Sequence, residues 1–143
     1  MTVAALIPVP AFANHSDDPT SAPNAESHEI VAGNPTCGND QFYQFKINGT
    51  PVNGTTPDGV IDIDNATPFS FDWAINDAFL DDFDIAAVIV KGGDNAIVYI
   101  YGQDTDDDDT NLQSPFNNGE QQAQISHVEF CFNEKGEPGP PPT

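Results

Sequence analysis

A run of acidic residues in the last third of the chain is its densest group of potential metal ligands. The five carboxylates are those of Asp104, Asp106, Asp107, Asp108 and Asp109. Thr110 and Asn111 follow directly and add further oxygen atoms. Ca²⁺ binds about six to eight oxygen ligands of this kind, but the Gly and Glu spacing of an EF-hand loop is missing. The pattern fits either a Ca²⁺ site or a solvated acidic loop that attracts cations without ordering them.

Motifs for covalent catalysis are absent from the sequence. There is no Gly-x-Ser-x-Gly motif, no phosphate-binding loop and no His/Cys cluster with zinc spacing. His15 and His28 lie in polar surroundings, and His127 sits within an apolar stretch where a structural hydrogen bond is expected. We therefore expect a protein without enzymatic activity and without an obligatory cofactor.

Four Asn-x-Ser/Thr sequons could accept N-linked glycans. Their asparagines are Asn14, Asn48, Asn53 and Asn65. Three of them fall in expected turns or at strand ends, where glycans are sterically tolerated. Glycosylation is thus consistent with a surface protein.

The two cysteines, Cys37 and Cys131, lie near the two ends of the expected folded region. In an oxidising compartment they would join the first strand of that region to the last, and the chain-entropy model credits so long a loop with about 4–5 kcal/mol. The alternative is a pair of buried free thiols. We expect the disulfide, because the rest of the sequence is typical of an extracellular protein.

The charge of the chain is strongly one-sided. It has 23 Asp and Glu residues against three lysines in 143 residues, a net charge of −20. Such a surface repels nucleic acid and anionic membranes. It also repels other copies of the same chain, so self-assembly needs cations, high salt or strong apolar contacts. No stretch is long and apolar enough to cross a bilayer.

Short β-branched and aromatic stretches separated by turn residues predict an all-β fold, a β-sandwich of about seven short strands. The organising element is an expected hairpin over 83–101, whose glycines Gly92 and Gly93 supply a tight turn. Alternation over 69–75 predicts a half-buried strand with Phe69, Phe71, Trp73 and Ile75 inward. Further strands are expected at 41–47, 60–64 and 125–133, a helical turn or irregular crossing at 76–84, and a long loop over 103–124.

The expected domain organisation has four parts. Residues 1–13 form an apolar arm, 14–36 a polar linker with little packing, 37–133 the β-sandwich, and 134–143 a Pro/Gly-rich tail. The arm fits either the remnant of a secretory signal or an extended donor strand. In the second interpretation one face of the strand carries Val3, Ala5, Ile7, Val9 and Ala11. Pro8 and Pro10 then leave only one edge of the arm able to pair fully.

Several short motifs follow one another along the C-terminal two-thirds of the chain. They are Val90-Lys91-Gly92-Gly93, Tyr99 to Tyr101, Asp104-Thr105, Leu112 with Pro115, and Ile125-Ser126-His127 with Phe130-Cys131. This pattern, over about 37–132, resembles a β-module of secreted and cell-surface proteins of bacteria and archaea. The resemblance implies an extracellular location and a Cys37–Cys131 bridge, and it implies no activity. The acidic run after Thr105 and the position of Asn117 depart from it.

An apolar arm, a polar linker and a β domain without a catalytic motif together resemble the subunits of pili and matrix fibres built by donor-strand exchange. The leading hypothesis is therefore a structural subunit of an extracellular, pilus-like filament, in which the arm completes a sheet of the neighbouring subunit. The alternative is a monomeric cell-surface binding or adhesion module, in one version Ca²⁺-dependent. Trp73 on the inward face disfavours an aromatic platform for sugars.

Overall fold

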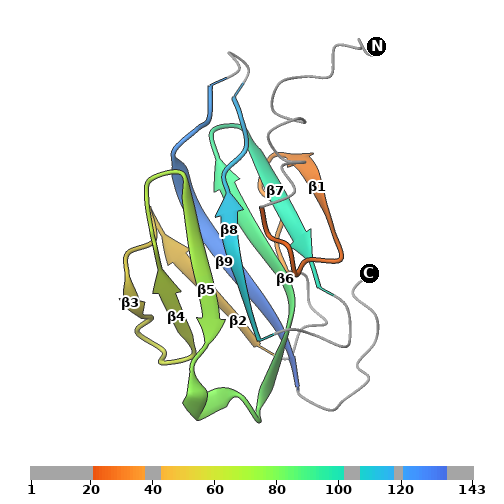
Figure 1. The fold of residues 1–143 in the computed structure, drawn as a ribbon. Helices are drawn as coiled ribbons and strands as arrows, with labels where there is room; N and C mark the ends of the chain where they lie inside the picture. Colours follow the sequence, from red (N-terminus) through yellow and green to blue (C-terminus); the bar gives the residue numbers. More distant parts are fainter. Residues whose placement is uncertain (1–20, 38–42, 102–106, 118–120, 135–143) are drawn as a thin grey trace.

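The structure, a computed structural model, describes residues 21–37, 43–101, 107–117 and 121–134. Nine strands and one short 3₁₀ helix lie within these ranges (Figure 1). The strands are β1 (Ser27–Ala32), β2 (Tyr43–Asn48), β3 (Gly54–Thr55), β4 (Ile61–Asp64), β5 (Ser70–Ile75), β6 (Phe83–Gly92), β7 (Asn95–Ile100), β8 (Asp108–Gln113) and β9 (Ile125–Glu134). The 3₁₀ helix η2 (Asp77–Phe79) provides the helical turn expected before the hairpin.

The strands form two antiparallel sheets that pack face to face, which confirms the predicted β-sandwich. One sheet has the order β1-β7-β6-β9-β2 and the other β3-β4-β5-β8. The hairpin of β6 and β7 is the centre of the larger sheet, as the sequence predicts. Its two central turn residues, Gly93 and Asp94, lie between the paired Gly92 and Asn95, and Gly93 takes a φ of 60° that favours glycine.

Large aromatic side chains from both sheets fill the core between them. Phe71 and Trp73 of β5 meet Phe130 of β9 edge to face, at ring-centroid distances of 6.3 and 6.2 Å. Phe71, Trp73 and Ile75 are buried, as their alternation predicts. Phe69 is instead 36% exposed, because it lies just before β5 begins at Ser70.

The predicted linker is wrong for its C-terminal part. β1, within 14–36, pairs antiparallel with β7 from Ser27↔Ile100 to Ala32↔Asn95. The sequence hides this strand because β1 is an edge strand with exposed Ser27, Glu29 and Ala32, so its composition is that of a polar segment. The predicted arm, residues 14–20 of the predicted linker and residues 135–143 of the predicted tail lie outside the described residues.

The predicted loop over 103–124 also contains a strand. β8 pairs with β5 in the smaller sheet, with a register shift between Phe71 and Trp73. Asp, Asn and Gln have low strand propensity, which is why the sequence DDTNLQ does not signal a strand. At the irregularity Asn111 has a φ of 56°, a conformation that Asn tolerates better than most residues.

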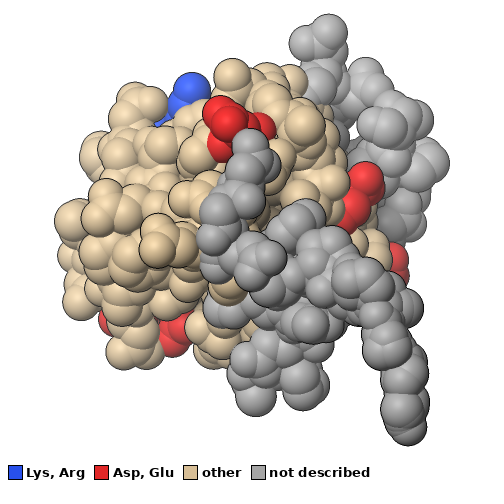
Figure 2. Space-filling view, turned by 90° about the horizontal axis from the view of Figure 1, so that it is seen from above, with Lys and Arg blue, Asp and Glu red and all other residues tan. Residues whose placement is uncertain are grey.

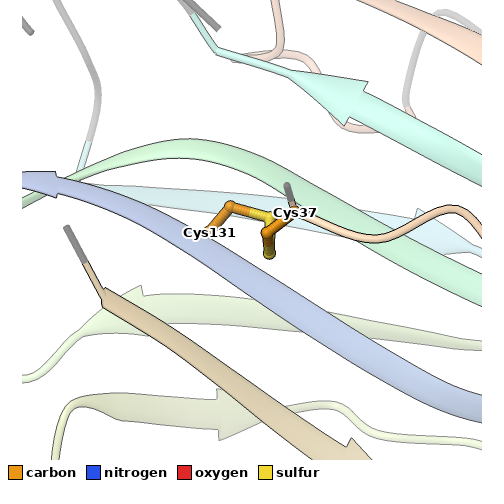
Figure 3. Close-up of a disulfide and its surroundings, with 2 residues drawn as sticks. All are labelled: Cys37 and Cys131. Atoms are coloured by element: carbon orange, nitrogen blue, oxygen red, sulfur yellow. A yellow bond between two sulfur atoms is a disulfide. The ribbon is translucent and has the colours of Figure 1, made fainter. Parts of the chain in front are cut away.

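The disulfide Cys37–Cys131 is present, with the two Cα atoms 5.5 Å apart (Figure 3). It joins the β1–β2 connection to the middle of β9, rather than the first strand to the last. That connection starts at the hairpin turn, where Gly33 N donates to Asp94 O at 2.9 Å. We call residues 33–37 the strap, because they cross the outer face of the larger sheet. There Cys37 packs on Ile89 and Ala96, so β6 is covered on both faces.

Candidate functional site

β-sandwiches can bind partners at the edges of their sheets, where backbone groups lack a neighbouring strand. The described edge strands here are β1, β2, β3 and β8. They differ in what lies against them. The edges of β8 and β2 are the most informative, because a described segment covers the first and no described strand pairs with the second.

The edge of β8 is closed by the segment that precedes β1. Ala22 N donates to Thr110 O and Ser21 Oγ to Asn111 O, both at 2.9 Å. Asn24 Nδ2 donates to Asp108 O at 2.8 Å. A further strand can therefore add to β8 only by displacing residues 21–24.

Asp109 is the centre of this closure. Its side chain is 1% exposed and accepts hydrogen bonds from Tyr101 Oη at 2.7 Å, Asn24 N at 3.1 Å and Thr110 N at 2.8 Å. Burial, and then the Asp109 carboxylate, raise the pKa of Tyr101 far above its usual value. Asp109, a predicted Ca²⁺ ligand, thus carries a structural hydrogen-bond network.

Replacing Asp109 tests that role. Asp109→Ala leaves the buried Tyr101 hydroxyl without its acceptor, which costs about 1–3 kcal/mol of unfolding free energy. The exposed neighbour provides the control, since Asp108→Ala should change stability by about 0.5 kcal/mol or less. Urea unfolding followed by Trp73 fluorescence measures both. Equal effects of the two substitutions would contradict the structural role.

The other predicted Ca²⁺ ligands are not assembled into a site in the described part of the chain. Asp104 and Asp106 lie outside the described residues. Across the described ranges, no three His, Cys, Asp or Glu side chains are grouped so that they could hold a metal ion. A hollow of about 310 Å³ is lined in part by Asp64, Asp72 and Asp108. There the Asp72 carboxylate already accepts hydrogen bonds from Asn65 Nδ2 at 2.6 Å and Asn111 N at 2.8 Å.

In contrast to β8, the outer edge of β2 has no partner strand within the part of the chain that the structure describes. Gly49 N donates to Ser126 O at 2.7 Å, next to the register pair Asn48↔His127. Because hydrogen-bonded and non-hydrogen-bonded pairs alternate along an antiparallel ladder, the backbone groups of Lys46 and Asn48 point away from β9. Among the described residues no strand pairs with this edge. The N–H and C=O groups of Lys46 and Asn48 therefore face an edge to which a strand could add.

An apolar groove lies between this edge and the smaller sheet. Its volume is about 400 Å³, within the range of about 300–1,000 Å³ usual for ligand pockets. β2, β3, β4 and the loops that flank β3 line it. The apolar lining residues are Phe45, Ile47, Val52, Pro57 and Ile63. We call this the β2 groove.

Both ends of the β2 groove are defined by specific features. At the start of β2, Tyr43 Oη donates to Asp58 Oδ2 at 2.8 Å and links the strand to the smaller sheet. Burial, and then Asp58, raise the pKa of Tyr43 to about 12, so the hydroxyl stays protonated as a donor. At the other end, the β2–β3 loop carries Val52, which is 75% exposed. Val52 also lines the groove and adds exposed apolar surface at this end.

Three basic side chains lie close together on the outer face of the larger sheet, and one of them, Lys91, is buried. Lys46, Lys91 and His127 occupy neighbouring positions on β2, β6 and β9. Lys91 Nζ donates to Gly93 O at 2.6 Å. Viewed from above, basic side chains appear in one small area, whereas acidic side chains appear in several (Figure 2). Lys46 lies on the rim of the β2 groove, with Glu129 of β9 directly across from it.

The pKa of His127 is lowered by burial first, and then by Lys46 and Lys91. Because the pKa of His127 is lower in the folded state than in the unfolded state, the unfolded state binds more protons at acidic pH. The contribution of the neutral His127 side chain to stability is therefore lost as the pH falls below about 6.5. His127→Gln removes the contribution. Thermal unfolding from pH 7.5 to 5 should show wild type losing stability relative to the variant. A pH-independent difference would contradict the lowered pKa.

The predicted glycan acceptors within the described ranges lie at the surface. Asn48, Asn53 and Asn65 are all exposed, and Asn14 lies outside those ranges. Asn48 and Asn53 line the rim of the β2 groove. Asn53 Oδ1 accepts a hydrogen bond from Ala66 N at 2.9 Å. A glycan at either rim position would share space with any strand bound there.

Comparisons with family models, with curated proteins and with solved structures give no match. The described residues contain no helix long and apolar enough to span a membrane. The sequence predicted the strand β2 and the side chains that it directs inward, but not the groove beside it. The available signal was Val52, an isolated apolar residue within the polar turn region 48–59.

Proposed function

We propose that this protein is a structural subunit of an extracellular, pilus-like filament, in which residues 1–13 of one copy add as a strand to β2 of the next. The observation that carries the proposal is the outer edge of β2, with which no described strand pairs, beside an apolar groove. In strand addition, main-chain hydrogen bonds supply affinity and pockets for alternate side chains supply specificity. The β2 edge and groove offer both.

The sequence of the arm complements the groove. Val3, Ala5, Ile7, Val9 and Ala11 would present one apolar face. The stretch 1–16 is also the longest in the chain without Asp, Glu, Lys or Arg. In a chain of −20 it is therefore the segment that another copy repels least.

The position of the groove favours a chain of subunits over a closed pair. The described chain begins at Ser21, bonded to β8, on the side where β1 also lies. β3, which lines the β2 groove together with β2, lies on the opposite side of the domain (Figure 1). A contact from one side of a copy to the opposite side of the next is heterologous, and it propagates into an open filament unless the rotation closes a ring.

The cellular location is part of the proposal. A disulfide forms and persists mainly in oxidising compartments, so the Cys37–Cys131 bridge supports secretion to the cell surface. The exposed sequons are compatible with that location. We assign the protein no catalytic role and no nucleic acid or lipid partner.

Deleting residues 1–13 tests the proposal. The truncated protein should remain folded, because the described core and disulfide do not include these residues. It should elute as a monomer in size-exclusion chromatography and form no filaments in negative-stain electron microscopy, whereas the full chain forms filaments of uniform width. Filaments from the truncated protein would contradict the proposal.

A second candidate is a monomeric surface module that binds an extended segment of another protein in the same groove. Val52, 75% exposed at the rim, supports a binding surface of either kind. Full-length protein that stays monomeric at all concentrations would favour this module. A Ca²⁺ titration would then test its Ca²⁺-dependent version, with EDTA as the control.

A further inference from the structure

We infer that the arm adds to β2 in the parallel sense, with Pro8 beside Lys46 and the odd-numbered side chains in the β2 groove. The inference rests on the proposed strand addition and specifies its polarity and register. It follows from two facts that can be checked separately. One is which residues of β2 direct their N–H and C=O groups to the outer edge, and the other is the position of two prolines in the arm.

The directions in which the backbone groups and side chains of β2 alternate determine how an incoming strand can pair with it. Phe45 and Ile47 point their side chains into the sandwich, where they pack against the core, and their backbone groups pair with β9. Lys46 and Asn48 have the reverse arrangement. Their side chains lie on the outer face, and their N–H and C=O groups point to the outer edge. The arm must satisfy those groups while placing its apolar side chains next to Phe45 and Ile47.

Antiparallel addition conflicts with the prolines. Residues that exchange hydrogen bonds across an antiparallel pair carry their side chains on the same face of the sheet. The arm residues bonded to Lys46 and Asn48 would then have outward side chains and would be even-numbered. Pro8 and Pro10 are even-numbered and have no N–H to donate. The ladder would lose two donors over the length of β2.

Parallel addition removes the conflict. In a parallel pair, a residue of one strand forms its two hydrogen bonds with the residues just before and just after the one directly beside it on the other strand. The side chains of those two residues lie on the face of the sheet opposite to its own side chain. The arm residues bonded to Lys46 would then be odd-numbered, with their apolar side chains in the groove. Both prolines would point away from β2, to the new edge of the sheet, where a missing N–H costs nothing.

The register follows from the size of the side chains. With Pro8 beside Lys46, Lys46 N donates to Ile7 O and Val9 N donates to Lys46 O. Ile7, the largest inward side chain of the arm, and Val9 next to it on the same face then enter the groove at its middle. The prolines at the outer edge would also block a further strand from adding there, because proline is an edge-blocking residue. The assembly would extend by one arm per subunit and would not widen into a sheet.

Two double-cysteine variants of the full chain decide the polarity. Both carry Asn48→Cys; one adds Pro10→Cys and the other Leu6→Cys. With Pro8 beside Lys46, position 10 lies beside 48 in parallel addition and position 6 lies beside 48 in antiparallel addition. The two arm positions are about 13 Å apart along a strand, and a disulfide requires Cα atoms about 4.4–6.8 Å apart. Only one pair can therefore cross-link. Pro8 is kept in both variants, and Asn48→Cys alone is the control for non-specific bridges.

Oxidised samples are compared on non-reducing gels, with electron micrographs of the same material. A ladder of covalent oligomers from the Pro10→Cys pair, and none from the Leu6→Cys pair, is the expected result. The reverse result, or filaments without either ladder, overturns the polarity while the filament proposal stands. If wild type forms no filaments either, the proposed function itself is wrong and the inference falls with it.

Discussion

Lys46→Pro should strongly weaken filament formation and leave the domain folded. The N–H of Lys46 faces the outer edge of β2 and not β9, so the domain loses no hydrogen bond of its own. Proline is tolerated in an edge strand at such a position. An incoming arm, however, would lose a donor and meet the proline ring. We expect a critical concentration for assembly raised by at least about tenfold, equivalent to about 1.4 kcal/mol.

Two controls separate the backbone effect from others. Lys46→Gln removes the charge but keeps the N–H, so its filaments should persist. Ile47→Pro removes an N–H that pairs with β9 and should destabilise the domain itself. Sedimentation measures assembly and urea unfolding measures stability. If Lys46→Pro assembled as well as Lys46→Gln, the β2 edge would not be the acceptor.

Removing the disulfide should have the largest effect on the stability of the isolated domain. Cys37 and Cys131 are 94 residues apart, and losing a native disulfide of this kind costs about 2–5 kcal/mol. A further loss is expected because the strap covers Ile89 and Ala96 only while Cys37 is held at β9. The double variant Cys37→Ala/Cys131→Ala should therefore lie near the upper end of that range, at about 4–5 kcal/mol.

The measurement is urea unfolding at fixed ionic strength, since guanidinium chloride would also screen the net charge of −20. Adding a thiol reductant to wild type should reproduce the variant's lower midpoint. The double variant should not respond to the reductant. An unchanged midpoint in the double variant would show that packing alone holds the strap.

The core of this fold could be predicted from the sequence because its pattern is local. The turn glycines of the β6–β7 hairpin, the inward Phe71 and Trp73 of β5, and Val128, Phe130 and Phe132 of β9 all follow from alternation and turn chemistry. Each of these strands contributes apolar side chains to the core, and the burial of one face produces the two-residue alternation of apolar and polar residues along the strand.

The missed elements depend on partners far away in the sequence. β1 and β8 are polar strands, held by the edge of β7 and by the irregular pairing with β5. The role of Asp109 depends on Tyr101 and Asn24, so a run of similar aspartates gives no sign that one of them is buried. The β2 groove exists only between two sheets. Its apolar lining could be listed from the sequence, but not the outer edge beside it.

The strap has a mechanical consequence for a filament under tension. In the proposed arrangement, each subunit would be pulled between Ser21 and the arm held at its β2. Force would peel β1 from β7 and then the strap from the outer face, until Cys37 is reached. The covalent link to β9 stops the peeling there. The 17 residues from Ser21 to Cys37 extend to about 55 Å, which limits how far a subunit can stretch before the force reaches β2 itself.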